Sequence, residues 1–126
     1  MLFSNPSVLV VEDNEQLGAL YCKVLSQIGL RVIQAESVTE ALERLATTVP
    51  DMVLLDMTMS DGNGMTIIDY LKKHSRFSET EIVVATGGSQ YQAYAEERGV
   101  EHFFQKPVSV RMLITFTRRL FLIRQT

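Results

Sequence analysis

Cysteine is nearly absent from this chain, in which Cys22 is the single thiol among 126 residues. One cysteine can form neither an internal disulfide nor a metal cage made of thiolates. Cys22 lies in a segment with the apolar pattern of a helix face, so we expect a small, buried side chain there. The two histidines, His74 and His102, have no cysteine or second histidine at ligand spacing, which leaves a zinc site without support.

Long apolar runs and an excess of basic residues are missing too. The longest uncharged apolar stretches, such as Ser7 to Val11 and Met52 to Leu55, are far shorter than the roughly 18 to 20 residues of a membrane helix. The N-terminus lacks the basic and then apolar pattern of a secretion signal. We therefore expect a cytoplasmic protein that does not enter a membrane. The formal net charge of -3 offers no field for collecting nucleic acid, so direct DNA binding is not expected.

Proline and glycine are scarce, with three and seven residues, and no repeat, low-complexity tract or linker composition interrupts the chain. With 46% apolar residues, a chain of 126 residues is long enough for one hydrophobic core and too short for a second domain of any size. We expect residues 1–126 to form one domain.

Five short runs of β-branched or aromatic residues alternate with segments long enough for helices. The runs begin near Val8, Arg31, Met52, Glu81 and His102. This alternation predicts a parallel sheet with helical crossovers, which is an α/β fold. Five strands cannot close a barrel of the eight-stranded kind, so we expect an open, doubly wound sheet between two layers of helices.

The first two connecting segments carry clear helical patterns. Apolar residues recur at steps of three and four from Leu17 to Ile28, and Gly29 follows where a helix end favours glycine. Ser37, with Glu40 three residues later, forms a capping-box pattern that predicts the start of a second helix, and Pro50 ends that region.

The next two connecting segments differ in strength. Met65, Ile68 and Leu71 predict a third helix beyond the glycine-bearing loop at 60–64. The fourth helix, from Ser89 to Arg98, is expected to be the least firmly anchored, because its apolar side chains are alanines and tyrosines only.

The last helix has two apolar sides. At about 100 degrees per residue, the side facing the sheet is predicted to hold Val110, Leu113, Ile114, Leu120 and Phe121. The opposite side holds Met112, Phe116, Leu122 and Ile123. An exposed apolar surface favours contact with another protein, here a second copy or an output domain. In the alternative interpretation, the stems of Arg118, Arg119 and Arg124 cover this side.

Side chains that can carry chemistry follow four of the predicted strands. They are Glu12 and Asp13 after the first strand, Asp56 after the third, Thr86 after the fourth, and Lys106 with Pro107 after the fifth. Ligands of doubly wound sheets bind beyond the carboxyl ends of the strands, so these side chains are expected to converge. Three carboxylates packed together repel one another unless a cation lies among them, and oxygen ligands favour Mg²⁺ or a similar divalent ion. An ammonium and a hydroxyl nearby would attract a phosphoryl group.

Sequence signatures of nucleotide binding are missing at the same edge. Neither GxxxxGK[ST] nor GxGxxG follows the first strand, where Asn14-Glu15-Gln16 would be hostile to the phosphates of a nucleotide. The remaining nucleophile is a carboxylate, and an aspartate can capture a phosphoryl group covalently while a metal and a lysine neutralise the developing charge.

Each of these residues also has a plain structural interpretation. Asp13 or Asn14 could cap the first helix, and Asp56 could be an ordinary loop carboxylate. Thr86 could be a β-branched strand residue, and Lys106 a solvated side chain before a proline turn. Independent structural roles would rarely place all of them at the ligand-binding edge of one sheet.

The motifs together resemble the receiver domain of two-component response regulators from about Pro6 to Gln125. The matching pieces are Val10-Val11-Glu12-Asp13-Asn14, the run from Pro50 to Asp56, Gly64, Thr86 after an apolar strand, and Phe104-Gln105-Lys106-Pro107. The resemblance implies a flavodoxin-like three-layer α/β/α sandwich with strand order 2-1-3-4-5. It also implies a cis Lys106-Pro107 peptide bond.

The resemblance further implies the roles of single residues. Asp56 would accept a phosphoryl group from the phosphohistidine of a histidine kinase or phosphotransfer protein. Asp13, Asp56 and the carbonyl of Thr58 would bind Mg²⁺, with Glu12 acting through water. Thr86 and Lys106 would engage the phosphate. Such a domain is a phosphoacceptor and not a turnover enzyme, and it changes the partner preference of the surface formed by the fifth strand and the fourth and fifth helices.

Receivers also use a paired movement of a hydroxyl residue and an aromatic residue, which correspond to Thr86 and Phe103. Phe103 lacks a phenolic hydroxyl, so a rotamer switch is conceivable but not one that needs a hydrogen bond from this ring. A static core phenylalanine is the alternative. The sequence departs from the family at Met59-Ser60, where methionine-proline is usual, and Asp61-Gly62 is expected to supply the turn in a freer loop.

Two other functions compete with the switch. An aspartate-nucleophile phosphohydrolase would need an acid/base aspartate two residues beyond Asp56, where this chain has Thr58. A degenerate receiver-like scaffold used only for binding would have no need of the complete set of acids, hydroxyl and lysine.

Overall fold

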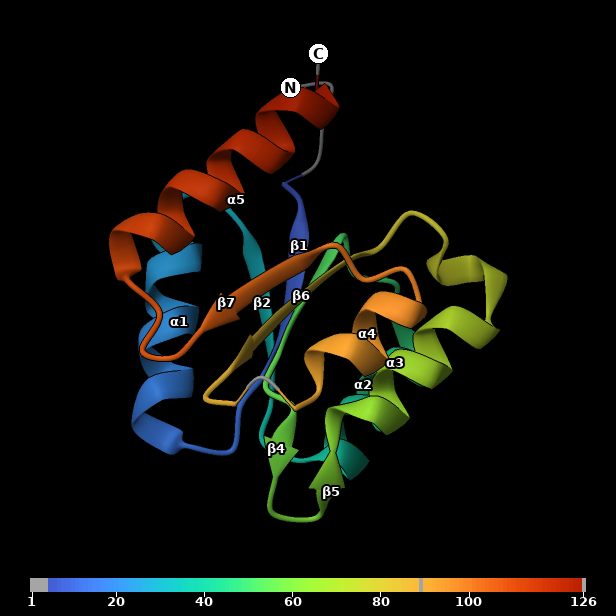
Figure 1. Ribbon diagram of the computed structural model, residues 1–126. Helices are drawn as coiled ribbons and strands as arrows, with labels where there is room; N and C mark the ends of the chain where they lie inside the picture. The colour runs from blue at the N-terminus through green and yellow to red at the C-terminus, as the bar shows by residue number, and fades with distance from the viewer. Residues whose placement is uncertain (1–4, 89, 126) are drawn as a thin grey trace.

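Five parallel strands form the central sheet of the computed structural model, which describes residues 5–88 and 90–125 and the side chains up to residue 121 (Figure 1). The strands are β1 (Ser7–Val11), β2 (Arg31–Ala35), β3 (Met52–Leu55), β6 (Glu81–Thr86) and β7 (His102–Gln105). Their spatial order is β2-β1-β3-β6-β7. Since β6 and β7 are the fourth and fifth strands of this sheet, the order is the predicted 2-1-3-4-5. It confirms the open, doubly wound α/β sheet.

Two layers of helices sandwich the sheet (Figure 1). The helices are α1 (Glu15–Gln27), α2 (Val38–Thr47), α3 (Gly64–Lys73), α4 (Gln92–Glu97) and α5 (Val110–Gln125), with the short 3-10 helix η1 (Ser75–Phe77) before β6. α1 and α5 cover one face, and α2, α3 and α4 cover the other. No helix within the described part of the chain is long and apolar enough to span a bilayer.

Strand alternation divides the hydrophobic core between these two layers. In β1, β3 and β6, the residues Val10, Leu54 and Ala85 pack in the α1/α5 layer. Their neighbours Val11, Leu55 and Val84 pack in the α2–α4 layer. Because successive side chains of a strand point to opposite faces, apolar strands without a polar face are what a sheet covered on both sides requires.

The predicted helix ends are confirmed where capping residues mark them. Asn14, and not Asp13, caps α1 by accepting a hydrogen bond from the backbone N–H of Leu17 at 2.9 Å. Ser37 caps α2 by accepting from the N–H of Glu40. Gly29 follows α1 with a φ of 102°, a conformation that glycine adopts without steric cost.

The connection between β3 and α3 differs from the prediction. It forms a small antiparallel hairpin of β4 (Thr58–Met59) and β5 (Gly62–Asn63), whose turn is Ser60-Asp61 and not Asp61-Gly62. The Asp61 carboxylate accepts hydrogen bonds from the backbone N–H groups of Val38 and Thr39, at 2.8 and 3.1 Å. These bonds join the loop to the start of α2, a contact that the sequence did not predict.

The fourth helix is short, in line with its weak sequence pattern. α4 has six residues, and its side-chain anchor is polar: Tyr94 donates to Asp69 of α3 at 2.6 Å, and Arg98 pairs with the same carboxylate at 2.8 Å. Ala95 is its buried residue. Residue 89, where this helix was expected to begin, lies outside the described part.

The two faces of α5 are only partly as predicted. Leu113 and Phe121 are buried, but the fully buried position between them is Thr117, which the apolar pattern missed. Phe116, expected on the outer side, is half-buried and packs edge-on against Phe104 with ring centroids 5.2 Å apart. Met112 is outside, with 57% of its surface exposed, whereas the side chains of Leu122 and Ile123 lie outside the described part.

Cys22 is half-buried on α1 and packs against the α1/α5 layer, instead of being fully buried as expected. Burial raises the pKa of its thiol. The thiol is therefore a partner in packing and is poorly suited to forming a reactive thiolate.

Candidate functional site

The carboxyl ends of β1, β3, β6 and β7 lie side by side at one edge of the sheet. Backbone bonds hold the residues that follow them in line: Asp56 N–H donates to the Val11 carbonyl at 3.0 Å, and Lys106 N–H donates to the Thr86 carbonyl at 2.9 Å. The Lys106-Pro107 peptide bond is cis, as the resemblance implied. The strand register thus brings together side chains that are up to 94 positions apart in the chain.

Lys106 is at the centre of this edge. Its Nζ lies 2.6 Å from Glu12 Oε1 and 3.2 Å from Asp56 Oδ2. Glu12 and Asp56 are both buried, and the lysine side chain is 21% exposed. Ion pairs at these distances in a partly buried place are stronger than those on an open surface, since water screens them less.

Burial and pairing act against each other on the ionisable groups. Burial raises the pKa of Glu12, and hydrogen bonds from Lys106 and from the Asn14 backbone counter this in part. Burial works against the charged form of Lys106, but the hydrogen bond to Glu12 and the charge of Asp56 outweigh it and raise the lysine pKa. Lys106 is therefore a cation at neutral pH.

Three carboxylates share this edge. Each of Glu12, Asp13 and Asp56 offers an oxygen, and these three oxygens lie within 4.8 Å of one another. Asp13 is exposed, and since Asn14 caps α1, the Asp13 carboxylate is not used as the helix cap. A compact set of oxygen ligands with one side open to solvent suits a divalent cation that keeps part of its water.

Thr58 follows Asp56 closely. Its backbone N–H donates to Asp56 Oδ1 at 3.1 Å, while the other oxygen, Oδ2, faces Lys106. Both oxygens of Asp56 therefore have donors that fix the orientation of the carboxylate.

Thr86 and Phe103 lie on the face of the sheet that α2, α3 and α4 cover. The apolar residues two positions before Glu12, Asp56 and Lys106 pack on the other face, against α1 and α5. Thr86 is buried and has the same strand orientation as Val84, and Phe103 packs with Val84 in the α2–α4 layer. A small cavity of about 50 Å³ is lined by both residues and by Gln92 of α4. The structure therefore places Thr86 and Phe103 together, next to α4.

Sequence reasoning missed three features of this edge. The Tyr21 hydroxyl was counted only as part of an apolar helix face, although the side chain lies near the charged residues. The bond from Asp61 to α2 joins residues more than 20 positions apart and has no local signal. Gly64 was named only as a piece of the family motif, and its packing reason was missed: a Cβ there would lie 2.6 Å from Met57 Sδ and 3.2 Å from the Asp56 carbonyl oxygen, so glycine permits the close approach of α3.

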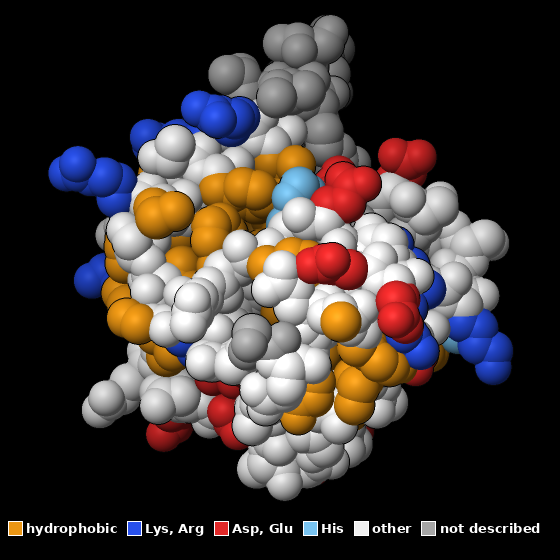
Figure 2. Space-filling model, viewed as in Figure 1, with side chains coloured by type: hydrophobic (Ala, Val, Ile, Leu, Met, Phe, Trp, Pro, Cys, Tyr) orange, Lys and Arg blue, Asp and Glu red, His pale blue; other side chains and the backbone are white. Residues whose placement is uncertain are grey.

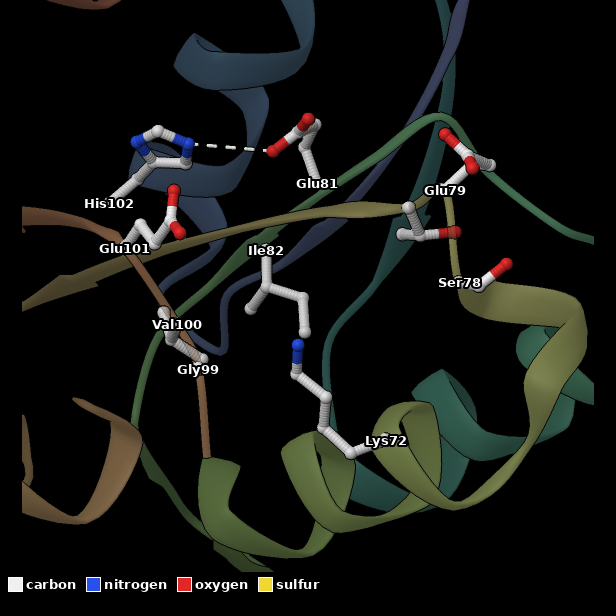
Figure 3. Close-up of a pocket in the computed structure, with 10 residues that line it drawn as sticks. Lys72, Ser78, Glu79, Glu81, Ile82, Gly99, Val100, Glu101 and His102 are labelled. Atoms are coloured by element: carbon white, nitrogen blue, oxygen red, sulfur yellow. Dashed lines mark ion pairs between the residues drawn. The ribbon is translucent and has the colours of Figure 1, made fainter. Parts of the chain in front are cut away.

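A pocket of about 240 Å³ lies elsewhere, at the amino ends of β6 and β7 (Figure 3). His102 Nε2 lies 3.4 Å from Glu81 Oε2, and Lys72 extends from α3 toward Ile82. This pocket shares no residue with the carboxylate cluster and lies at the other end of the strands. The lysine and the converging carboxylates make the carboxyl edge the better candidate.

An open parallel sheet with a carboxylate cluster and a paired lysine at its carboxyl edge defines a doubly wound α/β domain with its ligand site at that edge. The chain belongs to the response regulator receiver domain family, whose family model matches residues 8–118. It is thus a receiver domain of two-component signalling, a class of signalling switches.

The relatives that the chain matches include proteins about twice its length and proteins of about its own length. The chain is 31% identical over 109 residues to the phosphate regulon transcriptional regulatory protein PhoB of Escherichia coli, covering 85% of this chain and 48% of that protein. It is also 31% identical over 110 residues to the chemotaxis protein CheY1 of Helicobacter pylori, covering 84% and 89%. The chain therefore spans about half the length of the PhoB relatives and most of CheY1.

Solved structures share the fold. The non-phosphorylated HemR receiver domain from Leptospira biflexa superimposes with a TM-score of 0.82 and 28% identity, covering 91% of this chain and 93% of that one. A CheY-like receiver domain from Methanospirillum hungatei gives a TM-score of 0.86 at 19% identity, which is a likeness of fold alone.

Proposed function

We propose that this chain is a phosphoacceptor switch in a two-component phosphorelay, and not a turnover enzyme. Asp56 takes a phosphoryl group from the phosphohistidine of a histidine kinase or phosphotransfer protein. The observation that carries the proposal is the contact of Lys106 with Asp56 and Glu12 beside a third carboxylate, Asp13. This arrangement supplies a nucleophile, a fixed cation and a set of oxygen ligands at one point.

In the proposed reaction, one carboxylate oxygen of Asp56 attacks the phosphorus atom. An O–P bond forms, the P–N bond to the imidazole breaks, and the imidazole nitrogen keeps the electron pair and can take a proton from solvent. Lys106 stabilises the negative charge of the phosphoryl oxygens, and the Thr86 hydroxyl donates a hydrogen bond to one of them. Since Asp56 is already held by its two donors, little reorientation is needed before attack.

The carboxylate cluster fits a divalent cation, which we propose to be Mg²⁺. Asp13, Asp56 and the carbonyl of Thr58 would hold the ion directly, and Glu12 would act through water. When bound, the ion would supply positive charge beside the phosphoryl oxygens. The close approach of the three carboxylate oxygens supports this assignment, because they would repel one another without a cation.

Phosphorylation is proposed to act on α4, β7 and α5 through Thr86 and Phe103. The cavity shared by these two residues gives Phe103 room to change its packing once Thr86 turns toward a phosphoryl group. A static Phe103 remains the alternative in which Thr86 alone transmits the change.

The partner surface is proposed to include the outer side of α5. Hydrophobic side chains gather over β7 and α5, with Lys and Arg side chains around them (Figure 2). A groove of about 330 Å³ is lined there by Phe104, Met112 and Phe116, with Arg111 and Arg119 among its other lining residues. A second copy or an output domain would cover it. We expect the protein to act in the cytoplasm, without direct contact with nucleic acid or membrane.

Intact mass after incubation with acetyl phosphate and MgCl₂ tests the proposal. The wild type is expected to gain one phosphoryl group, and Asp56→Asn none. Asp51→Asn is the matched control, since Asp51 precedes the same strand at its opposite end, and it should still be labelled. Equal labelling of Asp56→Asn, or an unlabelled wild type, would contradict the proposal, and sustained turnover of a phosphoester would favour a phosphohydrolase.

A further inference from the structure

Tyr21 of α1 is a buried tyrosine whose hydroxyl makes no hydrogen bond with the described residues. The side chain is 2% exposed, and its oxygen has no hydrogen-bond partner among the described residues. Buried hydroxyl groups nearly always have a partner, because leaving one without costs the hydrogen bond that water would supply. The apolar face of α1 has no need of a hydroxyl at this position, so the group calls for another explanation.

Tyr21 packs on the face of the sheet that leads to the proposed site. It packs in the α1/α5 layer with Val10, Leu54 and Ala85. Val10 and Leu54 are each two residues before a charged site residue, Glu12 and Asp56. Since a strand returns to the same face every second residue, these two acids continue toward the side of the sheet on which Tyr21 lies.

Lys106 continues on that side as well. It is two residues beyond Phe104, which packs against the α1/α5 layer. The ring of Tyr21 therefore lies on the same face as all three charged residues. Burial raises the pKa of Tyr21, while the charge of Lys106 lowers it and those of Glu12 and Asp56 raise it, so the phenol is within electrostatic reach of each.

Lys106 has a donor left for this hydroxyl. An ammonium carries three N–H donors, and two are directed at Glu12 and Asp56. In the proposed reaction, the donor on Asp56 must turn to the incoming phosphoryl oxygens. Glu12 then remains as one partner of the lysine. Tyr21 offers a buried hydroxyl as a second partner, whereas Ser26, which also carries a hydroxyl on α1, is exposed.

We propose that Tyr21 is a positioning residue: its phenolic oxygen accepts the third N–H of Lys106 and holds the ammonium against the phosphoryl group. This inference rests on the proposed function. It assigns the buried hydroxyl a partner that appears when the lysine turns. If the hydroxyl has no such partner, Tyr21 fills the core and phenylalanine would serve as well.

The test is the rate of phosphorylation of Tyr21→Phe by acetyl phosphate with MgCl₂, followed by intact mass. Losing a hydrogen bond to a charged group is expected to lower the maximal rate about tenfold. The KM for acetyl phosphate should stay the same, because the lysine acts on the transferring group. In a Lys106→Met background, Tyr21→Phe should cause no further loss, since the two residues act as one unit.

Thr117→Val is the matched control. It removes the other buried hydroxyl without a partner among the described residues, on α5 near Ile28 and Leu30 at the opposite edge of the sheet. Thr117→Val should be phosphorylated at the wild-type rate. Thermal unfolding of both variants checks that each is folded.

Two results would overturn the inference while leaving the proposed function intact. One is a wild-type rate in Tyr21→Phe. The other is a fall in the maximal rate on Tyr21→Phe that is equally large in the wild-type and in the Lys106→Met background. Such a fall would show that the effect of Tyr21 does not depend on the lysine. A wild type that takes no phosphoryl group would overturn the proposed function and the inference together.

Discussion

Lys106 lies closer to Glu12 than to Asp56, with 2.6 Å between Nζ and Oε1 against 3.2 Å to Oδ2. The lysine therefore neutralises a buried glutamate that pairs with no other cation among the described side chains, while the carboxylate proposed to react is held less tightly. Lys106 thus has two separable roles: it neutralises Glu12 in the folded protein, and it is proposed to act on the phosphoryl group at Asp56. Stability measures the first role, and the phosphorylation rate measures the second.

Lys106→Met should destabilise the protein in the absence of divalent ions. Two buried carboxylates would then face each other without a cation, and the expected loss in the free energy of unfolding is about 2 kcal/mol. MgCl₂ should restore part of this loss, because a cation in the cluster would replace the missing positive charge. Urea unfolding with and without MgCl₂ measures both effects, and an unchanged midpoint in the metal-free variant would show that the ion pair does not stabilise the fold.

Substitutions of the neighbouring residues Asp13 and Asn14 should separate metal binding from helix capping. Asp13→Asn removes one ligand and is expected to weaken Mg²⁺ binding, with little effect on stability without the ion. Asn14→Ala loses the cap of α1 and should lower the free energy of unfolding by about 1 kcal/mol while leaving Mg²⁺ affinity unchanged. Calorimetric titration and urea unfolding of both variants test the pair. A loss of stability in Asp13→Asn together with weaker Mg²⁺ binding in Asn14→Ala would contradict this assignment of roles.

The Asp61 bond to α2 predicts a pH-dependent contribution to stability. Hydrogen bonds from the backbone of Val38 and Thr39 lower the pKa of Asp61. A carboxyl whose pKa is lower in the folded state stabilises the fold above its ordinary pKa, and this contribution is lost as the pH falls through the lowered value. Asp61→Asn should therefore be less stable than the wild type at about pH 7, with a smaller difference at about pH 3. A difference that does not change with pH would contradict this.

Gly64→Ala should disturb the backbone behind Asp56. The new Cβ would lie 3.1 Å from the Met57 Cα and 3.2 Å from the Asp56 carbonyl oxygen, and backbone atoms cannot yield as a flexible side chain can. We expect a loss of about 1 to 3 kcal/mol in the free energy of unfolding, as for other cases of overpacking. Gly87→Ala is the control, because no atom lies within 4 Å of its Cβ position and its φ is not positive. Equal stability of the two variants would rule out the steric argument.

The outer side of α5 should respond to Met112→Glu. Met112 is 57% exposed, so the charge can be added at little cost to the fold, whereas Phe116 packs against Phe104 and His102 and would be a poorer choice. If this side contacts a second copy, the phosphorylated wild type should have a larger mass in solution than phosphorylated Met112→Glu. Identical monomeric masses by light scattering would exclude self-association through this groove and leave the output domain as the proposed partner.

The strand ends were predictable because their information is local. Each apolar run ends in a polar residue, and the topology of a doubly wound sheet sends all parallel strand ends to one edge. The sequence could not decide between Asp13 and Asn14 as the cap of α1, since both residue types cap helices well. The structure decides it by geometry, with Asn14 accepting from Leu17.

Other features depend on contacts between distant segments. The strands β4 and β5 of the hairpin are each two residues long. Asp61 in its turn bonds to α2, a contact that no pattern within the loop predicts. Thr117 is polar, so a pattern made of apolar residues passes over it, although it lies four residues from both Leu113 and Phe121 and is fully buried. Phe116 packs inward against the ring of Phe104 in β7. The helical period of α5 alone gives no information about a neighbour on another element.

Thr86 and Phe103 pack on the α2–α4 side, whereas the apolar residues beneath Glu12, Asp56 and Lys106 pack on the α1/α5 side. The sheet is a partition between the two groups, and only its carboxyl edge joins them. Substitutions around Phe103 on the α4 side can therefore change the packing of that layer without touching the two buried acids or the lysine. The two faces of the domain can vary independently of each other.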